Sequence, residues 1–433
     1  MENKQEPPTD TPRNTILFEI KKISKNKVFL ADAAIALFLI WALALFLAVS
    51  QYTVKSSTLV SPVQTIKESV LNERVEARDN YLADADNEYR QVIGFLPSWT
   101  AAKSASIDFD KLTQIIYFGF GVNDNGEIIQ YNQEGKSTLE WVYFTSDYFI
   151  NARGKAKENN VKVLVAFKMF DNETIDNLIS NSVSADFFIR NAISILNKYD
   201  LDGINIDFEY FTDSSFPTSR YLNVFLQKLK DAIKKNNPEH LLSVDVNATV
   251  IVSDKAYDMV KIGEAVDEII VMGYDYRNAN SSRAGPTAPL YGEVNEHSID
   301  ESVKSLIGRV PLEKVILAVP FYGYEWETIN NKHKSTTVAG SGALATYKRV
   351  QDLLSAKQDI TVNWDENAMS PWFVYSQSGA IKQIYYEDER SIRAKMDYIK
   401  DNNLGGVAVW AIEYEGKYKE LWETVYWKLD DKE

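Results

Sequence analysis

Short apolar runs alternate with amphipathic segments of helical period from Gln91 to the C-terminal region. The runs are apolar at nearly every position, which is typical of strands buried on both faces of a parallel sheet. Eight such strands alternating with helices predict an α/β fold, a closed (β/α)8 TIM barrel. A doubly wound open sheet is the alternative, but it requires no eighth strand. The predicted strands are 92–95, 114–120, 161–167, 203–209, 242–247, 268–274, 315–321 and 407–411, and the flanking helices include 187–198, 219–235, 299–307 and 391–401.

The seventh strand and the helix at 391–401 are separated by about 70 residues, which is too long for a structureless loop in a compact domain. Residues 345–356 have a helical pattern, and three further pieces (361–364, 372–375 and 381–386) are aromatic and strand-like. The sequence therefore predicts a small α+β insertion after the seventh strand, at about 324–388.

The N-terminal region has a different pattern, because residues 28–49 form an apolar run whose one charge is Asp32. At ~1.5 Å per residue the run reaches roughly 33 Å, enough to cross a bilayer. Lysines precede it, which predicts a single-pass membrane protein with a cytoplasmic N-terminus and an extracytoplasmic barrel. A cleaved signal peptide ending near Ser50 is the alternative. The predicted organisation is a cytoplasmic tail (1–27), a transmembrane anchor (28–50), a spacer (51–89) and a barrel domain (90–433).

The composition of the chain argues against several kinds of functional site. The net charge is −14, and this acidity argues against a nucleic-acid partner. The chain has no Cys and its three His are widely scattered, so neither a thiolate site nor a zinc site is expected. No Gly-rich phosphate-binding fingerprint follows a predicted strand, which gives no support for a nucleotide site. The sequence thus predicts neither a metal nor a cofactor.

The fourth predicted strand carries the most unusual polar pattern. Side chains alternate between the two faces of a strand, so Asn205, Asp207 and Glu209 share one face and the apolar residues between them share the other. Carboxylates in a row repel each other and lose hydration when enclosed, so one of them is expected to hold its proton near neutral pH. An exposed strand with a solvated acidic face is the alternative.

The barrel fold orders these three side chains by depth. Catalytic groups of TIM barrels lie at the C-terminal ends of the strands. Glu209 would therefore lie at the barrel mouth, with Asp207 one layer deeper and Asn205 deeper still. An anionic Asp207 would make Glu209 harder to ionise, which suits Glu209 for general acid catalysis.

The run Asp202-Gly203-x-x-x-Asp207-x-Glu209 resembles the active-site strand of glycoside hydrolase family 18, the chitinase-like retaining glycosidases. Three further stretches at strand ends resemble the same family: Met272-Gly273-Tyr274-Asp275, Pro320-Phe321-Tyr322-Gly323-Tyr324, and Trp410 after Gly405-Gly406. The resemblance extends from about Gln91 to the C-terminus.

The resemblance implies substrate-assisted catalysis, in which the 2-acetamido carbonyl of the sugar attacks the anomeric carbon. Glu209 is then the acid and later the base, Asp207 orients and stabilises the acetamide nitrogen, and the Tyr274 hydroxyl bonds the acetamide oxygen. Trp410 is expected to stack on a pyranose face. The candidate substrate-binding residues are Asn205, Met272, Asp275, Trp410, Phe120 and Tyr322.

Two departures from the family pattern stand out. Asn205 replaces a common Asp, and its amide is expected to donate a hydrogen bond to Asp207 that holds Asp207 ionised. Val165-Ala166-Phe167-Lys168-Met169-Phe170 stands where the family often has a Ser-x-Gly-Gly turn, so the bulkier residues are expected to narrow or reshape the groove.

Taken with the predicted anchor, the resemblance implies a membrane-anchored retaining glycosidase. Its expected partner, besides the membrane, is an N-acetylated poly- or oligosaccharide substrate with β-1,4 linkages, such as chitin, chitooligosaccharides or peptidoglycan. One alternative is a glycan-binding, lectin-like relative that has lost catalysis; such relatives typically lack the acid, which is present here as Glu209. A membrane-tethered scaffold is the other alternative, and no specific feature favours it.

Overall fold

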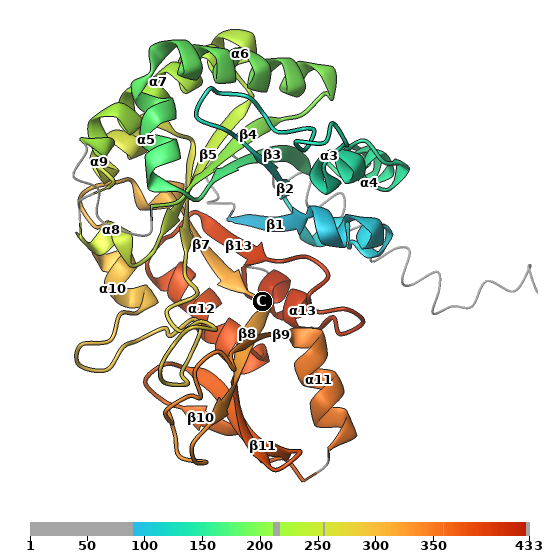
Figure 1. Ribbon diagram of the computed structural model, residues 1–433, viewed down its shortest axis with the longest axis vertical. Coiled ribbons are helices and arrows are strands. Elements are labelled where there is room, and N and C mark those ends of the chain that lie inside the picture. Colours follow the sequence, from blue (N-terminus) through green and yellow to red (C-terminus); the bar gives the residue numbers. More distant parts are fainter. Residues whose placement is uncertain (1–89, 211–216, 254–255, 358, 430–433) are drawn as a thin grey trace, which may run out of the picture. The chain divides into compact units, whose positions relative to one another are not determined.

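The computed structural model describes residues 90–210, 217–253, 256–357 and 359–429. Eight parallel strands close into a barrel in the order β1-β13-β7-β6-β5-β4-β3-β2 (Figure 1). Pairing of Gln91 with Gly406 joins the first strand to the last, so the open-sheet alternative is wrong. The strands are β1 (Gln91–Pro97), β2 (Gln114–Gly121), β3 (Lys162–Met169), β4 (Gly203–Phe208), β5 (Leu241–Asn247), β6 (Glu268–Met272), β7 (Val315–Pro320) and β13 (Gly406–Trp410).

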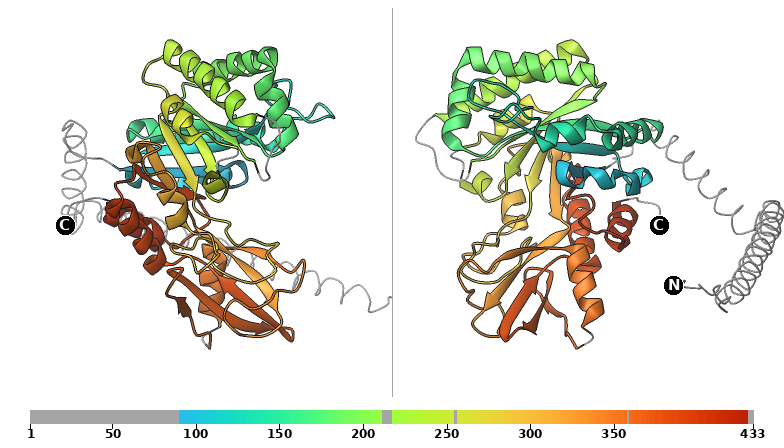
Figure 2. Two further views of the ribbon diagram at one scale, coloured as in Figure 1. Left: turned by 90° about the vertical axis from the view of Figure 1, so that its left-hand side faces the viewer. Right: turned by 45° about the vertical axis from the view of Figure 1, so that its right-hand side comes forward.

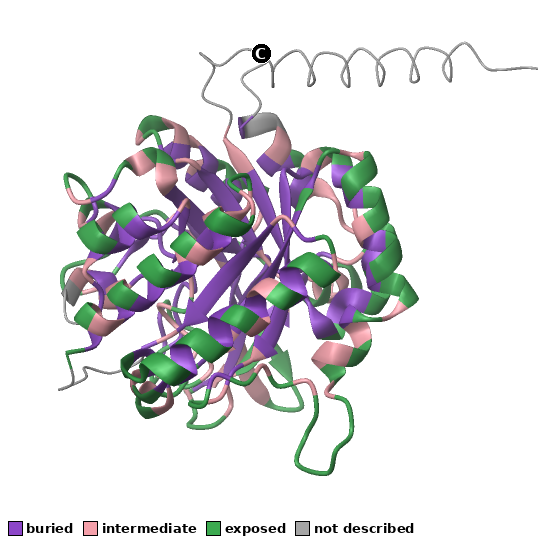
Figure 3. Ribbon diagram, turned by 90° about the horizontal axis from the view of Figure 1, so that it is seen from above, coloured by how far each residue is buried: buried purple, intermediate pink, exposed green. Residues whose placement is uncertain are grey.

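Helices surround the barrel, with buried faces toward the strands and exposed faces toward solvent (Figure 3). Several begin at side-chain caps of the expected type: the Asn181 side chain caps α6, and Asp388 forms a capping box with Ser391 at α12. The helices outside the insertion are α3 (Leu139–Phe144), α4 (Asp147–Glu158), α5 (Asn172–Ser180), α6 (Ser182–Lys198), α7 (Thr218–Asn236), α8 (Val250–Ser253), α9 (Met259–Ala265), α10 (Ile299–Lys304), α12 (Glu389–Asp401) and α13 (Glu420–Leu429), with 3-10 segments η2 (Ser98–Ser106), η3 (Phe109–Lys111) and η4 (Leu312–Lys314).

The insertion after β7 is a separate lobe beside the barrel, visible in all three side views (Figures 1 and 2). It is an antiparallel five-stranded sheet in the order β10-β11-β12-β8-β9 with one helix. The helix and the three strand-like pieces predicted from the sequence are all present, whereas β8 and β9 were not predicted as strands. Its elements are β8 (Tyr322–Thr328), β9 (Ala343–Thr346), α11 (Tyr347–Ala356), β10 (Asn363–Asp365), β11 (Ser370–Gln377) and β12 (Ala380–Tyr385).

Side chains on the inner face of the barrel form a compact apolar cluster beneath the mouth. This inner cluster is distinct from the larger core between strands and helices, so the alternation of each strand decides which residues reach the mouth. The inner cluster contains Ile93, Phe95, Ile116, Phe118, Leu164, Ala166, Ile270, Ile316, Ala318 and Ala408.

The predicted tail, anchor and spacer (1–27, 28–50 and 51–89) lie outside the described residues, so their boundaries stay predictions. Within the described ranges from 90 to 429, no helix combines the length and apolarity that a membrane crossing requires.

Candidate active site

The three polar residues of β4 are ordered by depth, as the alternation predicts. Asn205 is fully buried, Asp207 is 2% exposed, and Glu209, just beyond the end of the strand, is partly exposed. The Glu209 backbone N–H donates to the Met169 carbonyl (2.9 Å), which extends the ladder to β3 and fixes where the Glu209 side chain emerges. The acid is therefore held on a rigid strand end rather than on a free loop.

The environment of Glu209 suits a proton donor near neutral pH. Burial, and next the negative charge of Asp275, raise the pKa of Glu209 to about 7. The predicted cause was an anionic Asp207, and Asp207 and Glu209 do repel each other, an effect that raises the pKa of Asp207. Asp207 is itself too deeply buried to hold its charge easily, and Asp275 is a second carboxylate that opposes ionisation of Glu209.

A second carboxyl, Asp245 of β5, lies in the barrel interior beside Asp207 and was not predicted as a site residue. Ile206 pairs with Val244 in the parallel register, so the next inward positions are those of the two aspartates. Asp245 is 3% exposed. Burial raises the pKa of both carboxyls well above the usual range, and Asp245 raises that of Asp207 further.

The Asn205 amide donates to Asp245, so the prediction that it donates a hydrogen bond to Asp207 was wrong. The two Asn205 amide hydrogen bonds go to Asp245 Oδ1 (2.8 Å) and Ser243 Oγ (3.0 Å). The reason is register: β4 and β5 are neighbours, so the Asn205 amide reaches across to β5 instead of along its own strand. Ser243, Asp245 and Asn247 alternate with apolar residues, a signal like that of β4 that would have revealed Asp245.

Tyr274 and Asp275 follow β6 and face the same mouth. Asp275 has a left-handed backbone conformation (φ 61°), which Asp tolerates better than most residues. Its Oδ1 accepts hydrogen bonds from the hydroxyls of Tyr322 (2.6 Å) and Tyr324 (3.2 Å), so β8 holds this carboxylate in place. The hydroxyl of Tyr274 has no hydrogen-bond partner within the described part of the chain, whereas Met272, at the end of β6, is buried.

An aromatic wall stands at the opposite side of the barrel from β4 and β5. The half-buried ring of Trp410 packs against Phe118 (ring centroids 4.6 Å apart) and Phe95 (5.5 Å). Trp99, which is 51% exposed, lies 6.3 Å from Trp410. A half-exposed indole at the mouth, fixed from behind by other rings, is suited to stack on the apolar face of a sugar.

Phe120 is not part of this wall, so its prediction as a substrate-binding residue was wrong. The β2–β3 register shifts between Tyr117 and Phe120, and this bulge reverses the alternation of β2. Phe120 is fully buried against Trp141, Phe144 and Phe167 outside the barrel. Phe118 instead points into the barrel, where simple alternation would have placed both rings.

Lys168 brings a positive charge to the mouth at the position where the family's glycine turn is missing. It pairs in register with Asp207, and its Nζ lies 4.7 Å from the Phe118 ring centroid and 3.7 Å from Glu140 Oε1. Its charge lowers the pKa of Asp207, against the larger effect of burial. Lys168 therefore favours the ionised form of Asp207, a role that was predicted for Asn205.

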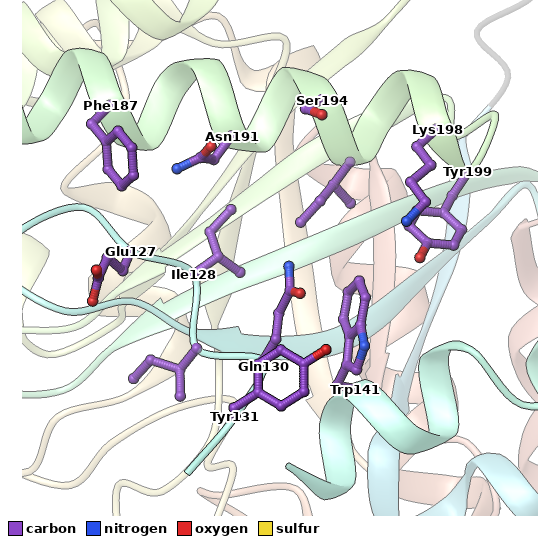
Figure 4. A pocket seen from close by; sticks show the side chains of 12 residues that line it. Glu127, Ile128, Gln130, Tyr131, Trp141, Phe187, Asn191, Ser194, Lys198 and Tyr199 are labelled. Atoms are coloured by element: carbon purple, nitrogen blue, oxygen red, sulfur yellow. The ribbon is translucent and has the colours of Figure 1, made fainter. Parts of the chain in front are cut away.

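A hollow of about 510 Å³ lies apart from the barrel mouth (Figure 4). Residues 127–131 of the β2–α3 connection form one side, and Phe187, Asn191, Ser194 and Lys198 of α6 form the other. None of the catalytic candidates lines it.

In the described ranges of residues 90–429, no group of three or more acidic or histidine side chains is arranged to hold a metal ion.

The chain matches the model of the glycosyl hydrolases family 18 over residues 91–415, and it belongs to that family. It is 28% identical over 256 residues to a probable chitinase 2 of Drosophila melanogaster (54% of this chain, 52% of the relative). It is 25% identical over 249 residues to a putative sporulation-specific glycosylase of Bacillus subtilis (56% and 54%). The chain thus spans about half the length of these curated relatives.

The crystal structure of the Group IV chitinase of Ostrinia furnacalis superposes with a TM-score of 0.68 at 21% identity, covering 78% of this chain and 99% of that chain. At this identity the likeness establishes the fold alone.

Proposed function

We propose that this protein is a retaining glycosidase that hydrolyses β-1,4 linkages next to N-acetylglucosamine in chitin-like glycans. One observation carries the proposal: Glu209, with a pKa of about 7, stands at the mouth directly above the buried Asp207 on the same strand. Two carboxyls on one strand do not flank a glycosidic bond, so the usual pair of acid and nucleophile is not available on β4. Asp275, the other carboxylate at the mouth, is held by the hydroxyls of Tyr322 and Tyr324, so the acetamide of the substrate is the proposed nucleophile.

In the proposed reaction Glu209 protonates the glycosidic oxygen as the bond to the anomeric carbon breaks. The carbonyl oxygen of the 2-acetamido group attacks that carbon from the opposite face and forms a cyclic oxazolinium ion. Asp207 accepts the acetamide N–H and stabilises the positive charge. The free hydroxyl of Tyr274 bonds the acetamide oxygen. Glu209 then deprotonates a water molecule that opens the ring, so the product retains its anomeric configuration.

Incubating the full-length protein with chitooligosaccharides is expected to shorten them, because the substrate supplies the acetamide. The matched control is the fully deacetylated glucosamine oligomer of equal length, which should remain intact. A thiazoline analogue of N-acetylglucosamine, which resembles the cyclic intermediate, should inhibit competitively. Binding of the oligosaccharide without shortening would instead support the lectin-like alternative, and equal cleavage of the deacetylated oligomer would exclude acetamide participation.

We also propose that residues 28–50 anchor the enzyme in a membrane with the barrel on the extracytoplasmic side. The support is the length of the apolar run and the lysines before it. The intact chain should stay in the membrane pellet after a carbonate wash at high pH, whereas a chain lacking residues 1–50 should be released. A mature N-terminus found just after Ser50 would contradict the anchor and support a cleaved signal peptide.

A further inference from the structure

The barrel interior contains a carboxyl pair, but the two carboxyls are on neighbouring strands. The β4 position that carries an Asp in the family pattern is Asn205, and the second buried carboxyl is Asp245 on β5. Asn205 Nδ2 lies 2.8 Å from Asp245 Oδ1, and both residues are almost completely shielded from solvent. Asn205 thus places an amide on β4 where the family pattern has a carboxyl, and the carboxyl that this amide contacts, Asp245, lies on the neighbouring strand β5.

The hydrogen bonds of Asn205 and Asp207 indicate which carboxyl of the pair holds the proton. Asn205 donates both amide hydrogens, so the carboxylate of Asp245 is the form that this contact stabilises. Asn205 Oδ1 and Asp207 Oδ1 are both buried and have no hydrogen-bond partner among the described residues. A buried carboxylate oxygen without a donor is costly, so this environment favours the protonated, neutral form of Asp207.

We propose that Asp245 is a positioning residue of this active site: fixed by the Asn205 amide, it supplies from β5 the second carboxylate that controls the proton on Asp207. This inference rests on the proposed function. In the free enzyme the negative charge is on Asp245 and the proton is on Asp207. When the acetamide N–H of the substrate reaches Asp207, the proton passes to Asp245. Asp207 then becomes the anion that the oxazolinium ion needs, and the net charge of the pair stays at one negative.

Other charged and titratable groups that act on the pair come from several elements. Glu209, just beyond β4, opposes the ionisation of the pair. Lys168 on β3 favours the Asp207 anion, and the hydroxyls of Tyr274 and Tyr257 also lie within electrostatic range. These groups stay in place when residue 245 changes. A shift in pH dependence after substitution at this position therefore reports on the pair itself.

The test is the pH profile of kcat/KM for a fluorogenic chitobioside in the full-length Asp245→Asn variant. Without Asp245, the one negative charge of the pair must form on Asp207, which lacks the Asn205 amide donor, so the acidic limb should move about one pH unit higher. The double variant Asn205→Asp with Asp245→Asn returns the carboxyl to β4, and its acidic limb should return toward that of the wild type. Asn205→Asp alone adds a third acid and should move the limb to higher pH.

The matched control is Glu268→Gln. Glu268 is also a buried carboxyl inside the barrel, hydrogen-bonded to Gln114 at the opposite end, so its removal should leave the profile unchanged. An acidic limb that stays in place in both Asp245→Asn and Asn205→Asp would overturn the proposal. A merely structural role would lower stability without moving the limb and without rescue by the double variant. Lack of turnover by the wild type would refute the proposed function, and this outcome differs from those that refute the role of Asp245.

Discussion

Replacing Glu209 with Gln should lower kcat for a fluorogenic chitobioside by about 10²–10⁴-fold, the usual contribution of a general acid. Gln has nearly the same shape but no proton to give to the glycosidic oxygen, so binding of the chitobioside should remain measurable. Steady-state kinetics and equilibrium binding on the same preparation separate the two effects. Wild-type turnover in this variant would eliminate Glu209 as the acid.

The pH dependence provides an independent check on the same residue. Glu209 acts in its protonated form, and its pKa is about 7, so wild-type kcat/KM should fall as the pH rises through neutrality. This alkaline limb should be absent from the residual activity of Glu209→Gln. Glu264→Gln, which changes a surface carboxyl paired with Lys261, serves as the control and should retain the full profile.

The barrel could be predicted from the sequence because its signals are local. Each strand is a short, almost uniformly apolar run, and the polar alternation at Asn205, Asp207 and Glu209 is contained within a single strand. The depth order of these three residues follows from strand geometry alone. The insertion was predictable because its aromatic strand-like pieces fill a gap that is too long for a loop.

The errors concern contacts between strands, which one strand's pattern does not encode. Phe120 was misplaced because a bulge reverses the alternation within β2, and the bulge depends on pairing with β3. The Asn205 contact was assigned to the wrong residue because sequence spacing brings Asp207 near, whereas register brings Asp245 nearer in space. A second charge that opposes ionisation of Glu209, that of Asp275, comes from another strand end and was not predicted.

Replacing Asp207 with Asn should lower kcat by about 10²–10³-fold, the size of effect seen when one preorganised electrostatic group is removed. The amide can still accept the acetamide N–H through its oxygen, but it carries no negative charge to stabilise the oxazolinium ion. The thiazoline analogue should therefore also bind less tightly. Asp186→Asn, at an exposed ion pair with Lys228, is the matched control and should retain wild-type kinetics.

The same substitution should stabilise the protein at neutral pH, which separates loss of charge from loss of fold. The pKa of Asp207 is raised in the folded state, so the folded protein binds more protons than the unfolded chain above the ordinary carboxyl range. Wild-type stability therefore decreases as the pH rises through that interval. The amide in the Asp207→Asn variant needs no proton, so the melting temperature of the variant should exceed that of the wild type at pH 8, with the difference shrinking toward pH 4. A lower melting temperature together with lost activity would show that Asp207 serves the fold rather than the reaction.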